Sequence, residues 1–299
     1  MNRLCEGRVA IVTGAGRGLG REHSLMLAVH GAKVVVNDLG ANIDGSGGDA
    51  SLASQVVADI RAAGGEAVAN GDDVSTWNGA RSLVDHAVKT FGTLDVLINN
   101  AGILRDRMLA NMTEEEWDSV IKVHLKGTFA PSRHAVAYWR DRSKELGRPV
   151  KARIINTSST SGIFGNVGQT NYGAAKAGIA AFSIIAAREL RRYGITVNAI
   201  SPSAQTRMTE GLRELTEEQR AKRNPRWVSP IVTWLASEES QDVTGRVFQT
   251  GNGIFAILEG WHRGPTIDQL DDPTKLGPIV KDLIGRARKN AGMDGLDLD

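Results

Sequence analysis

The 299-residue sequence predicts an α/β fold, a single doubly wound parallel sheet of about seven strands with helices on both faces. Short β-branched runs alternate along the chain with longer helical segments, which is the pattern of βαβ units. Most of these runs are continuously apolar, as expected where helices cover both faces of a sheet. A glycine-rich turn follows the first run, where such folds bind phosphate groups.

Each expected strand is followed by a helix or an irregular connection. The strands are expected at Val9–Thr13, Lys33–Asp38, Glu66–Asn70, Asp95–Asn99, Arg153–Thr157 and Ile195–Ile200, with a seventh around Arg246–Thr250. The helices are expected near Leu19–His30, Ser51–Ala63, Thr76–Thr90, Thr113–Tyr138, Tyr172–Tyr193 and Ser229–Ala236. Thr113, followed three residues later by Glu116, predicts a capping box at the start of the fourth helix.

Three segments are expected to be irregular. Leu39–Asp49 is rich in Gly, Asp and Ser and lengthens the connection after the second strand, and Asp141–Val150 is expected to be a charged surface insertion. From about Gly260 onward the chain turns polar. We therefore expect a dinucleotide-binding and catalytic domain over residues 1–259, followed by a C-terminal extension over 260–299 that serves as a lid, an oligomer arm or a surface wrap with no catalytic role.

Composition excludes several classes of function. The 36 basic residues nearly cancel the 34 acidic ones, so no global field recruits nucleic acid. No apolar run is long enough for a membrane span. The one cysteine, Cys5, excludes an internal disulfide and indicates a reducing compartment. With no signal-peptide pattern at the start and no peroxisomal tripeptide at the end, we expect a cytoplasmic protein. The scattered histidines have no ligand spacing, so we expect no metal.

Chemically suggestive residues follow the strands one after another. In an open parallel sheet, ligands bind at the carboxyl ends of the strands, near the point where strand order reverses. Residues at these ends are Gly14–Gly20, Asp38, Asp73, Asn100, Ser159 and the pair Ser201-Pro202. Loops on the opposite edge carry no comparable set. The sequence therefore predicts one site along this edge of a Rossmann-type sheet.

The glycine loop is expected to hold a pyrophosphate. Glycines permit a tight turn and let the backbone approach the phosphates, which rest on the amides of the following helix. The spacing fits G-x-x-x-G-x-G and not G-x-G-x-x-G, because Leu19 stands at the sixth position. A turn with no ligand is the alternative. The residues expected to bind cofactor here are Gly14, Gly16, Arg17, Gly18, Leu19 and Gly20.

Asp38 decides the expected cofactor. A carboxylate at the end of the second strand accepts hydrogen bonds from ribose hydroxyls and repels a 2′-phosphate, which favours NAD over NADP. Arg17 favours the opposite choice, but we weigh the carboxylate more heavily because two like charges at the ribose would repel. Asp73 and Val74 are expected to contact the adenine, or else Asp73 merely precedes a helix cap at Ser75.

Tyr172 and Lys176 are expected to move a proton. At i and i+4 they share one helix face, so the ammonium can lie close to the phenol and lower its pKa. Tyr172 would then act as base in oxidation and as acid in reduction. Ser159 can donate a hydrogen bond to the substrate oxygen where charge develops. A Tyr–Lys pair alone is usually a surface contact, and its value comes from Ser159 and the glycine loop.

Together these residues resemble the short-chain dehydrogenase/reductase superfamily across about Gly7–Gly253. Finer matches resemble the (3R)-hydroxyacyl-CoA dehydrogenase part of the multifunctional enzyme type 2 of β-oxidation. They are Val36–Gly40, Asn100–Arg107, Val123–Leu125, Gly162–Asn166, Ser201-Pro202 and Thr206–Thr209. The resemblance implies NAD-linked oxidation of a 3-hydroxyacyl-CoA and a homodimer or homotetramer. It also implies a cofactor contact at Asn100, Ala101 and Gly102 on the adenosine side, and further contacts at Tyr172 and Lys176.

Two positions depart from the superfamily pattern. His124 stands where most members have an asparagine that completes a proton relay through a water near the lysine. It matches the narrower subfamily, and either a catalytic relay through His124 or simple packing of its imidazole is expected. Pro202-Ser203 replaces the usual Pro-Gly after the sixth strand, so the sequence does not predict the conformation of the loop on the nicotinamide side.

Other functions stay open at this point. The same residues suit a reductase of 3-oxoacyl groups on acyl carrier protein or a hydroxysteroid dehydrogenase. A non-catalytic NAD-binding sensor or scaffold is a further alternative, although the intact set of Ser159, Tyr172 and Lys176 argues against it. No G-x-S-x-G elbow is present to support a hydrolase.

Overall fold

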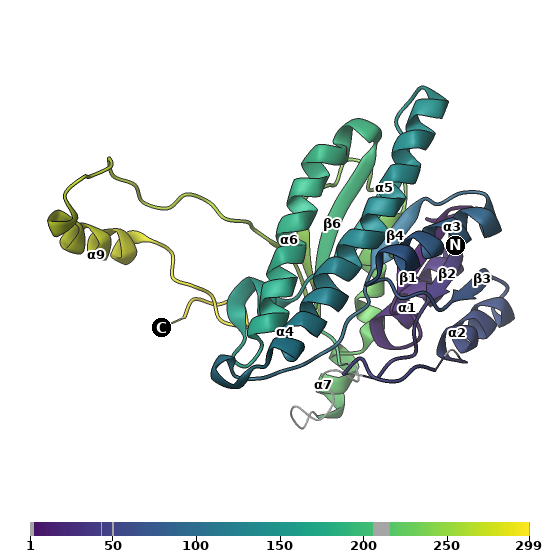
Figure 1. The fold of residues 1–299 in the computed structure, drawn as a ribbon, viewed down its shortest axis with the longest axis horizontal. Helices are drawn as coiled ribbons and strands as arrows, with labels where there is room; N and C mark the ends of the chain where they lie inside the picture. The colour runs from purple at the N-terminus through teal and green to yellow at the C-terminus, as the bar shows by residue number, and fades with distance from the viewer. Residues whose placement is uncertain (1–2, 43, 50, 206–215, 299) are drawn as a thin grey trace.

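The computed structural model describes residues 3–42, 44–49, 51–205 and 216–298. Its strands form one sheet in the order β3-β2-β1-β4-β5-β6-β7-β8 (Figure 1). They are β1 Val9–Thr13, β2 Lys33–Asn37, β3 Glu66–Asn70, β4 Val96–Asn99, β5 Ala152–Thr157, β6 Ile195–Pro202, β7 Val247–Gly251 and β8 Ile254–Leu258. All pairings are parallel except that of β7 with β8. The predicted α/β architecture is confirmed, with one strand more than expected.

Most helices lie close to their predicted positions, but those at Glu217–Lys222 and Leu276–Arg286 were not predicted. They are α1 Gly18–Val29, α2 Ser51–Ala62, α3 Trp77–Phe91, α4 Glu114–Ile121, α5 Gly127–Leu146, α6 Thr170–Leu190, α7 Glu217–Lys222, α8 Ser229–Ala236 and α9 Leu276–Arg286. Short π-helical segments are η2 Lys122–Lys126 and η3 Ser161–Gly165, and 3₁₀ turns are η1 Leu109–Asn111, η4 Arg191–Tyr193, η5 Pro225–Trp227 and η6 Pro273–Lys275. None of the described helices is both long and apolar enough to cross a membrane.

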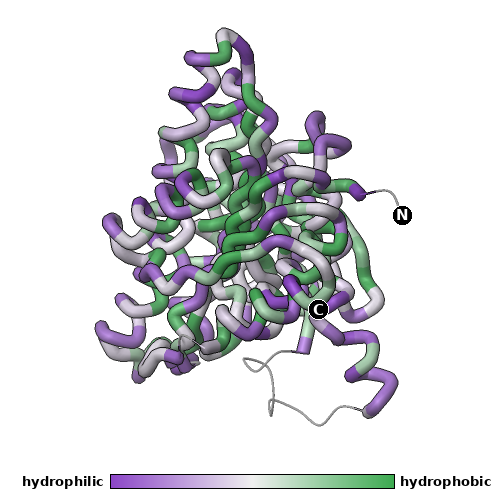
Figure 2. Tube along the Cα trace, turned by 90° about the vertical axis from the view of Figure 1, so that its right-hand side faces the viewer, coloured by the Kyte–Doolittle hydropathy of each residue, from purple (hydrophilic) through white to green (hydrophobic). Residues whose placement is uncertain are grey.

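Each face of the sheet has its own apolar core. Ala10 and Val12 of β1 pack with α1, α2 and α8, whereas Val9 and Ile11 pack with α3, α5 and α6. Because successive side chains of a strand point to opposite faces, both sets must be apolar. Figure 2 shows the hydrophobic strands in the middle of the body, between more hydrophilic helices. Cys5 belongs to the first core, where it is fully buried and its thiol donates to the Thr233 carbonyl at 3.4 Å.

The eighth strand was missed, although the sequence carries a signal for it. β7 and β8 are joined by Asn252 and Gly253, whose φ angles of 53° and 77° are the left-handed values of a two-residue hairpin turn. Asn-Gly is the strongest short-range hairpin signal. The apolar side chains of β8 are largely exposed at the sheet edge, so its pattern resembles a loop more than a buried strand.

The predicted helix over Thr113–Tyr138 is in fact two helices with a π turn between them. The capping box is confirmed, since Thr113 and Glu116 exchange hydrogen bonds at the start of α4. The extra residue of the η2 turn interrupts the regular ladder before α5 begins. α5 then continues to Leu146 and ends at Gly147, where φ is 63°. The first half of the expected surface insertion Asp141–Val150 is therefore helical.

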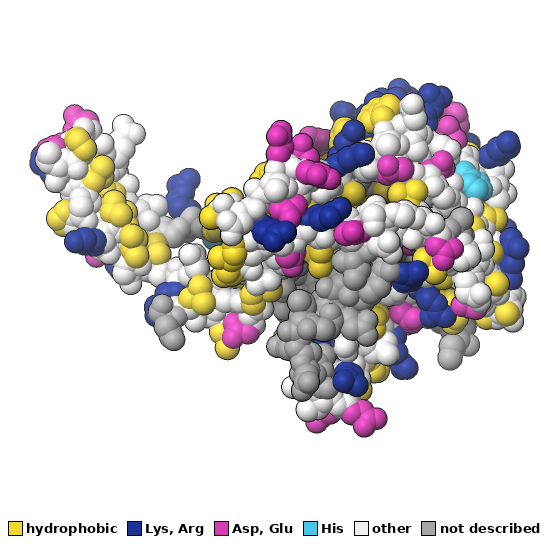
Figure 3. Space-filling view, turned by 60° about the horizontal axis from the view of Figure 1, so that its bottom comes forward, with side chains coloured by type: hydrophobic (Ala, Val, Ile, Leu, Met, Phe, Trp, Pro, Cys, Tyr) yellow, Lys and Arg dark blue, Asp and Glu magenta, His cyan; other side chains and the backbone are white. Residues whose placement is uncertain are grey.

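The chain after β8 forms an arm that projects from the body (Figure 1). Its helix α9 exposes Leu276, Val280 and Ile284 on one side, and Figure 3 shows hydrophobic side chains on the surface of the arm. The arm then returns, and a β-carbon at Gly295 would lie 3.6 Å from the Phe164 ring of η3. The division at residue 259 stays a prediction, and the end of β8 at Leu258 agrees with it.

Candidate active site

The crevice of the sheet opens between β1 and β4, where strand order reverses. The Thr13 hydroxyl accepts hydrogen bonds from the backbone N–H groups of Asn100 at 2.9 Å and Ala101 at 3.1 Å. The Asn100 side-chain amide donates to the carbonyls of Thr13 and Gly14, each at 3.1 Å. Asn100 therefore lies at the predicted site, and its side chain hydrogen-bonds the start of the glycine loop.

The glycine loop has no room for side chains at its two ends. A β-carbon at Gly20 would lie 2.2 Å from the Gly14 carbonyl oxygen, and one at Gly14, where φ is +61°, would lie 2.8 Å from Ala101. The N-cap residue of α1, Arg17, makes no side-chain capping bond. The first amides of α1 thus face the crevice as donors, which is the arrangement that binds a pyrophosphate.

Asp38 lies directly after β2, which ends one residue earlier than predicted. Its carboxylate accepts hydrogen bonds from the backbone N–H groups of Gly16 at 2.7 Å and Gly40 at 2.6 Å. A β-carbon at Gly16 would lie 2.9 Å from this carboxylate. These contacts fix the negative charge beside the glycine loop, where a ribose hydroxyl donor would meet it.

Asp73 and Val74, the residues expected to contact the adenine, lie between β3 and α3. The Asp73 carboxylate accepts from the backbone N–H and the hydroxyl of Ser75, at 2.9 and 2.6 Å, and so closes a turn. Val74 is buried in the core, and the cap of α3 is Thr76. A cap at Ser75 is therefore wrong by one residue, whereas the adenine contact stays a prediction.

The structure brings Ser159, Tyr172 and Lys176 together beside this crevice. Ser159 follows β5, and its hydroxyl lies close enough to the Tyr172 phenol to lower its pKa, while Lys176 lies one turn further along α6. The Lys176 ammonium lies 5.5 Å from the centre of the Tyr172 ring and donates to the Thr157 carbonyl at 2.6 Å. The lysine is only 3 % exposed.

Burial dominates the protonation of the Tyr–Lys pair. It raises the pKa of Tyr172 to about 12, against the lowering effect of the Ser159 hydrogen bond, and lowers the pKa of Lys176 to about 7. We expected the lysine to lower the pKa of the phenol. Burial of the phenol outweighs any such lowering, and the lysine is itself desolvated.

His124 lies in the η2 turn and is almost fully buried. Its ring meets the Tyr172 ring edge-on with centres 5.1 Å apart. Nε2 accepts from the Ile103 backbone N–H at 3.1 Å and lies 2.7 Å from the Ile103 carbonyl oxygen. Burial lowers the pKa of His124 to about 3, with Lys176 adding to the effect, so the ring is neutral.

Three buried polar atoms lie on residues of this region without a protein partner. The Thr157 hydroxyl, the Ser201 hydroxyl and His124 Nδ1 have no hydrogen-bond partner among the described residues. Of these residues, sequence reasoning singled out Ser201 and His124 but missed Thr157, whose position at the end of β5 was the available signal. Buried polar groups are normally satisfied, so these atoms fit a polar ligand such as the nicotinamide end of a dinucleotide.

The structure describes only the first residues of the loop after β6, Ser203 to Gln205. Ser203, which replaces the usual glycine, donates its backbone N–H to the Thr250 carbonyl at 2.8 Å and so continues the pairing with β7. The segment Thr206–Thr209, which the resemblance singled out, lies outside the described residues.

A profile described as short chain dehydrogenase matches residues 8–219. The chain belongs to the short-chain dehydrogenase family. Membership makes it an oxidoreductase of the kind that acts on CH–OH groups and implies a nicotinamide cofactor. The crystal structure of a short-chain dehydrogenase from Mycobacterium avium is 53% identical, covers 97% of this chain and 98% of its own, and has a TM-score of 0.86.

Two relatives have informative names. Hydroxyacyl-CoA dehydrogenase ChsB1 of Mycobacterium tuberculosis is 47% identical over 98% of this chain and 93% of its own length. Peroxisomal multifunctional enzyme type 2 of Mus musculus is 45% identical over 92% of this chain, which spans only 34% of that enzyme. The resemblance inferred from the motifs is confirmed. Because a relative is named peroxisomal, the cytoplasmic location stays a prediction.

We predict that Lys176→Met stabilises the folded chain at low pH. The folded-state pKa of Lys176 lies below its ordinary value of 10.5, so the buried ammonium destabilises the fold fully below about pH 7. This penalty fades as the pH rises toward 10.5. Urea unfolding should show a gain of about 1–3 kcal/mol at pH 6, and much less at pH 9.5. The exposed Lys89→Met is the control, and an equal gain at both pH values would contradict the burial argument.

Proposed function

We propose that this chain is an NAD-dependent dehydrogenase that oxidises the 3-hydroxyl group of a (3R)-hydroxyacyl-CoA, and reduces the 3-oxo group in reverse. The observation that carries the proposal is the meeting of Ser159, Tyr172 and Lys176 beside the glycine loop, at one edge of one sheet. The names of the relatives support the acyl-CoA substrate.

In the proposed reaction, Tyr172 takes the proton of the substrate hydroxyl. The Ser159 hydroxyl donates to the same substrate oxygen and holds it next to the phenol. Bound NAD supplies the hydride acceptor and a positive ring. A cation next to the phenol favours phenolate, so Tyr172, whose pKa burial raises to about 12, becomes a competent base only in the loaded site. Lys176 accepts or releases a proton near neutral pH because its pKa is about 7.

His124 has a supporting role in this proposal. Its Nε2 binds the Ile103 backbone, and its ring packs edge-on against Tyr172. Nδ1, which has no partner among the described residues, would exchange a proton with a water that links it to the lysine, as a proton relay requires. A β-carbon at Gly102 would lie 2.4 Å from the ring, so the glycine preceding Ile103 makes room for the imidazole.

We also propose NAD and not NADP as the cofactor. The Asp38 carboxylate is held by two backbone N–H groups of the loop region, so it cannot turn away from a 2′-phosphate without losing them. Arg17 is exposed and lies close enough to Asp49 to help lower its pKa, after the hydrogen bonds from Ser51. The positive charge of Arg17 is therefore close to the Asp49 carboxylate and does not need a 2′-phosphate to balance it.

We predict that Asp38→Ala weakens NAD binding and relaxes the rejection of NADP. Removing the carboxylate loses a charge-assisted hydrogen bond to ribose, worth about 1.5–3 kcal/mol, or roughly 10- to 150-fold in Kd. Titration with NAD and NADP in parallel measures both effects. Asp44→Ala, in the same loop but bonded to Ser46 and not beside Arg17, is the matched control. An unchanged ratio of the two Kd values would refute the cofactor assignment.

We predict that the purified chain forms NADH with medium- or long-chain (3R)-hydroxyacyl-CoA and that Tyr172→Phe abolishes this turnover. Loss of the acid–base hydroxyl should lower kcat by at least about 10²-fold while NAD binding persists. Tyr193→Phe, on 3₁₀ turn η4, is the control. No turnover with any acyl-CoA would overturn the substrate assignment, strong preference for NADPH and acyl carrier protein would favour the reductase alternative, and full activity of Tyr172→Phe would refute the role of the phenol.

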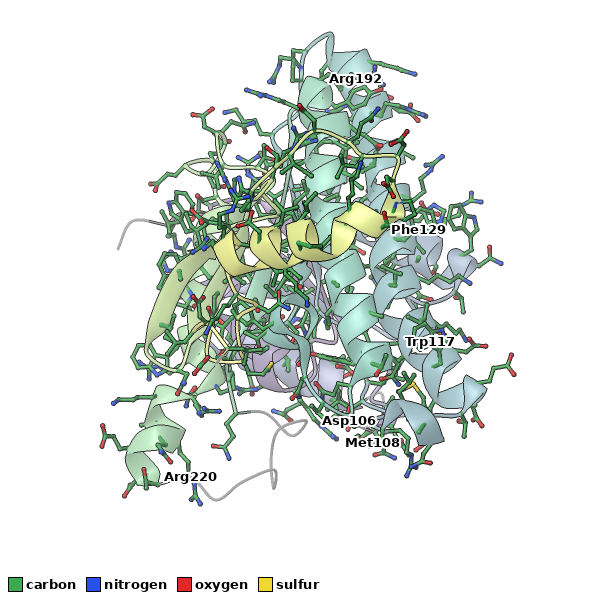
Figure 4. The ribbon with its side chains drawn as sticks, turned by 90° about the vertical axis from the view of Figure 1, so that its left-hand side faces the viewer. Asp106, Met108, Trp117, Phe129, Arg192 and Arg220 are labelled. Carbon is green, nitrogen blue, oxygen red and sulfur yellow. The ribbon has the colours of Figure 1, made fainter. Side chains whose placement is uncertain are left out.

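We further propose that the chain assembles as a homo-oligomer through the face formed by α4, α5 and α6. Trp117, Phe129 and Ile185 expose large apolar side chains on these helices, with exposed fractions of 38 %, 44 % and 57 %. Figure 4 shows Trp117 and Phe129 at the right-hand margin of the body. A self-complementary apolar face is what a two-fold dimer requires.

We predict a mass in sedimentation equilibrium that is a multiple of the 32.0 kDa chain. Phe129→Asp should shift the equilibrium toward monomer, because it places a charge in an apolar interface. Val29→Asp is the matched control, since Val29 is 57 % exposed on α1 beneath the other face of the sheet. A mass of one chain at micromolar concentration would contradict the proposal.

A further inference from the structure

The chain just before Tyr172 is joined to the chain just after β4. The Arg107 backbone N–H donates to the Gly168 carbonyl at 2.8 Å, and Arg107 and Gln169 form an isolated parallel bridge. The Gln169 side-chain amide donates to the Asp106 carboxylate at 2.8 Å and its oxygen accepts from the Asn166 amide at 2.9 Å. Gln169 is 8 % exposed, so this bridge is built into the protein.

A second buried side-chain amide, that of Asn171, also links the start of α6 to the chain after β4. Asn171 is fully buried, and its amide donates to the carbonyls of Arg105 at 2.9 Å and Glu116 at 3.0 Å. Its side-chain oxygen accepts the Tyr172 backbone N–H at 2.7 Å. The start of α6, and with it the phenol, is therefore positioned against the segment Arg105–Arg107.

Three ionisable groups contact the Tyr172 ring or act on its pKa. Lys176 lies on its own helix, and His124 faces it from η2. From the segment after β4 comes Asp106, whose charge raises the pKa of Tyr172 in addition to the effect of burial. The adjoining Arg107 is paired with Glu116 at 3.0 Å, and the hydrogen bond from the Thr113 backbone and then this pairing lower the pKa of that glutamate. Figure 4 shows Asp106 at the lower end of the body.

We propose that Asp106, held in place by Gln169, is a positioning residue that keeps the proton on Tyr172 and so sets the pH at which oxidation begins. The inference rests on the proposed role of Tyr172 as acid and base. A negative charge near the phenol opposes phenolate. The Asp106 charge therefore favours the phenol form of Tyr172, which reduction needs, and shifts the phenolate form, which oxidation needs, to higher pH.

The experiment compares pH profiles of kcat/KM for oxidation and reduction. Asp106→Asn keeps an oxygen for the Gln169 amide and removes only the charge, so the oxidation profile should move to lower pH. On the rising limb, the rate should increase by about two- to fivefold. The reductive profile should fall at lower pH as well, and Asp106→Glu should restore the wild-type behaviour. Asp85→Asn, on the distant helix α3, removes the same charge as a control.

A purely structural role for Asp106 predicts a different result. In that case Asp106→Asn leaves the profiles coincident with wild type, and only Asp106→Ala, which also removes the hydrogen bond, lowers kcat. Coincident profiles would overturn the inference. If Tyr172→Phe is inactive while Asp106→Asn matches wild type, only this inference fails, and the proposed function stands. An active Tyr172→Phe would instead overturn the proposed function.

A second measurement uses the wild-type chain and does not depend on the variant folding. Asp106 is an exposed residue, so salt should screen its charge, whereas the buried groups around the phenol are screened much less. Raising the ionic strength to about 1 M should move the oxidation profile to lower pH. An unchanged profile, or a shift to higher pH, would count against the proposed effect of the carboxylate.

Discussion

The hydrogen bonds between Thr13 and the Asn100 segment are the constraint on which the site depends. They join the ends of β1 and β4, the two strands whose following helices cover opposite faces of the sheet. The glycine loop contacts the segment after β4 through the Asn100 side-chain amide and through the close approach of Gly14 to Ala101. This contact fixes the loop at the point where the sheet opens.

Desolvation is the second constraint on the site, because it favours the uncharged form of each buried ionisable side chain. Tyr172 is kept as the phenol, Lys176 is shifted toward the amine, and His124 is kept as the neutral imidazole. A site whose own groups disfavour charge responds strongly to a single added charge, because little else competes with it. Asp106 differs from these groups in being exposed.

The strands and the chemistry of the site were predictable, because both follow from local patterns. Continuous apolar runs such as Val34–Val36 mark buried parallel strands, and Tyr172, Lys176 and Ser159 were recognised by spacing and by position after a strand. The π turn at Lys122–Lys126 could not be predicted, because one extra residue barely changes a helical apolar pattern. The dominant effect on the protonation of the pair could not be predicted, because spacing places Lys176 near Tyr172 but does not reveal that both are desolvated.

The burial of Cys5 has a practical consequence. It is the single cysteine of the chain, it is fully buried, and burial raises the pKa of its thiol to about 11. Thiol reagents attack the thiolate, so the native protein should remain almost unlabelled at neutral pH. A cysteine introduced on α9 or beside Phe164 would then carry a fluorophore or spin label alone. The movements of the arm could be followed in solution without first removing any native residue.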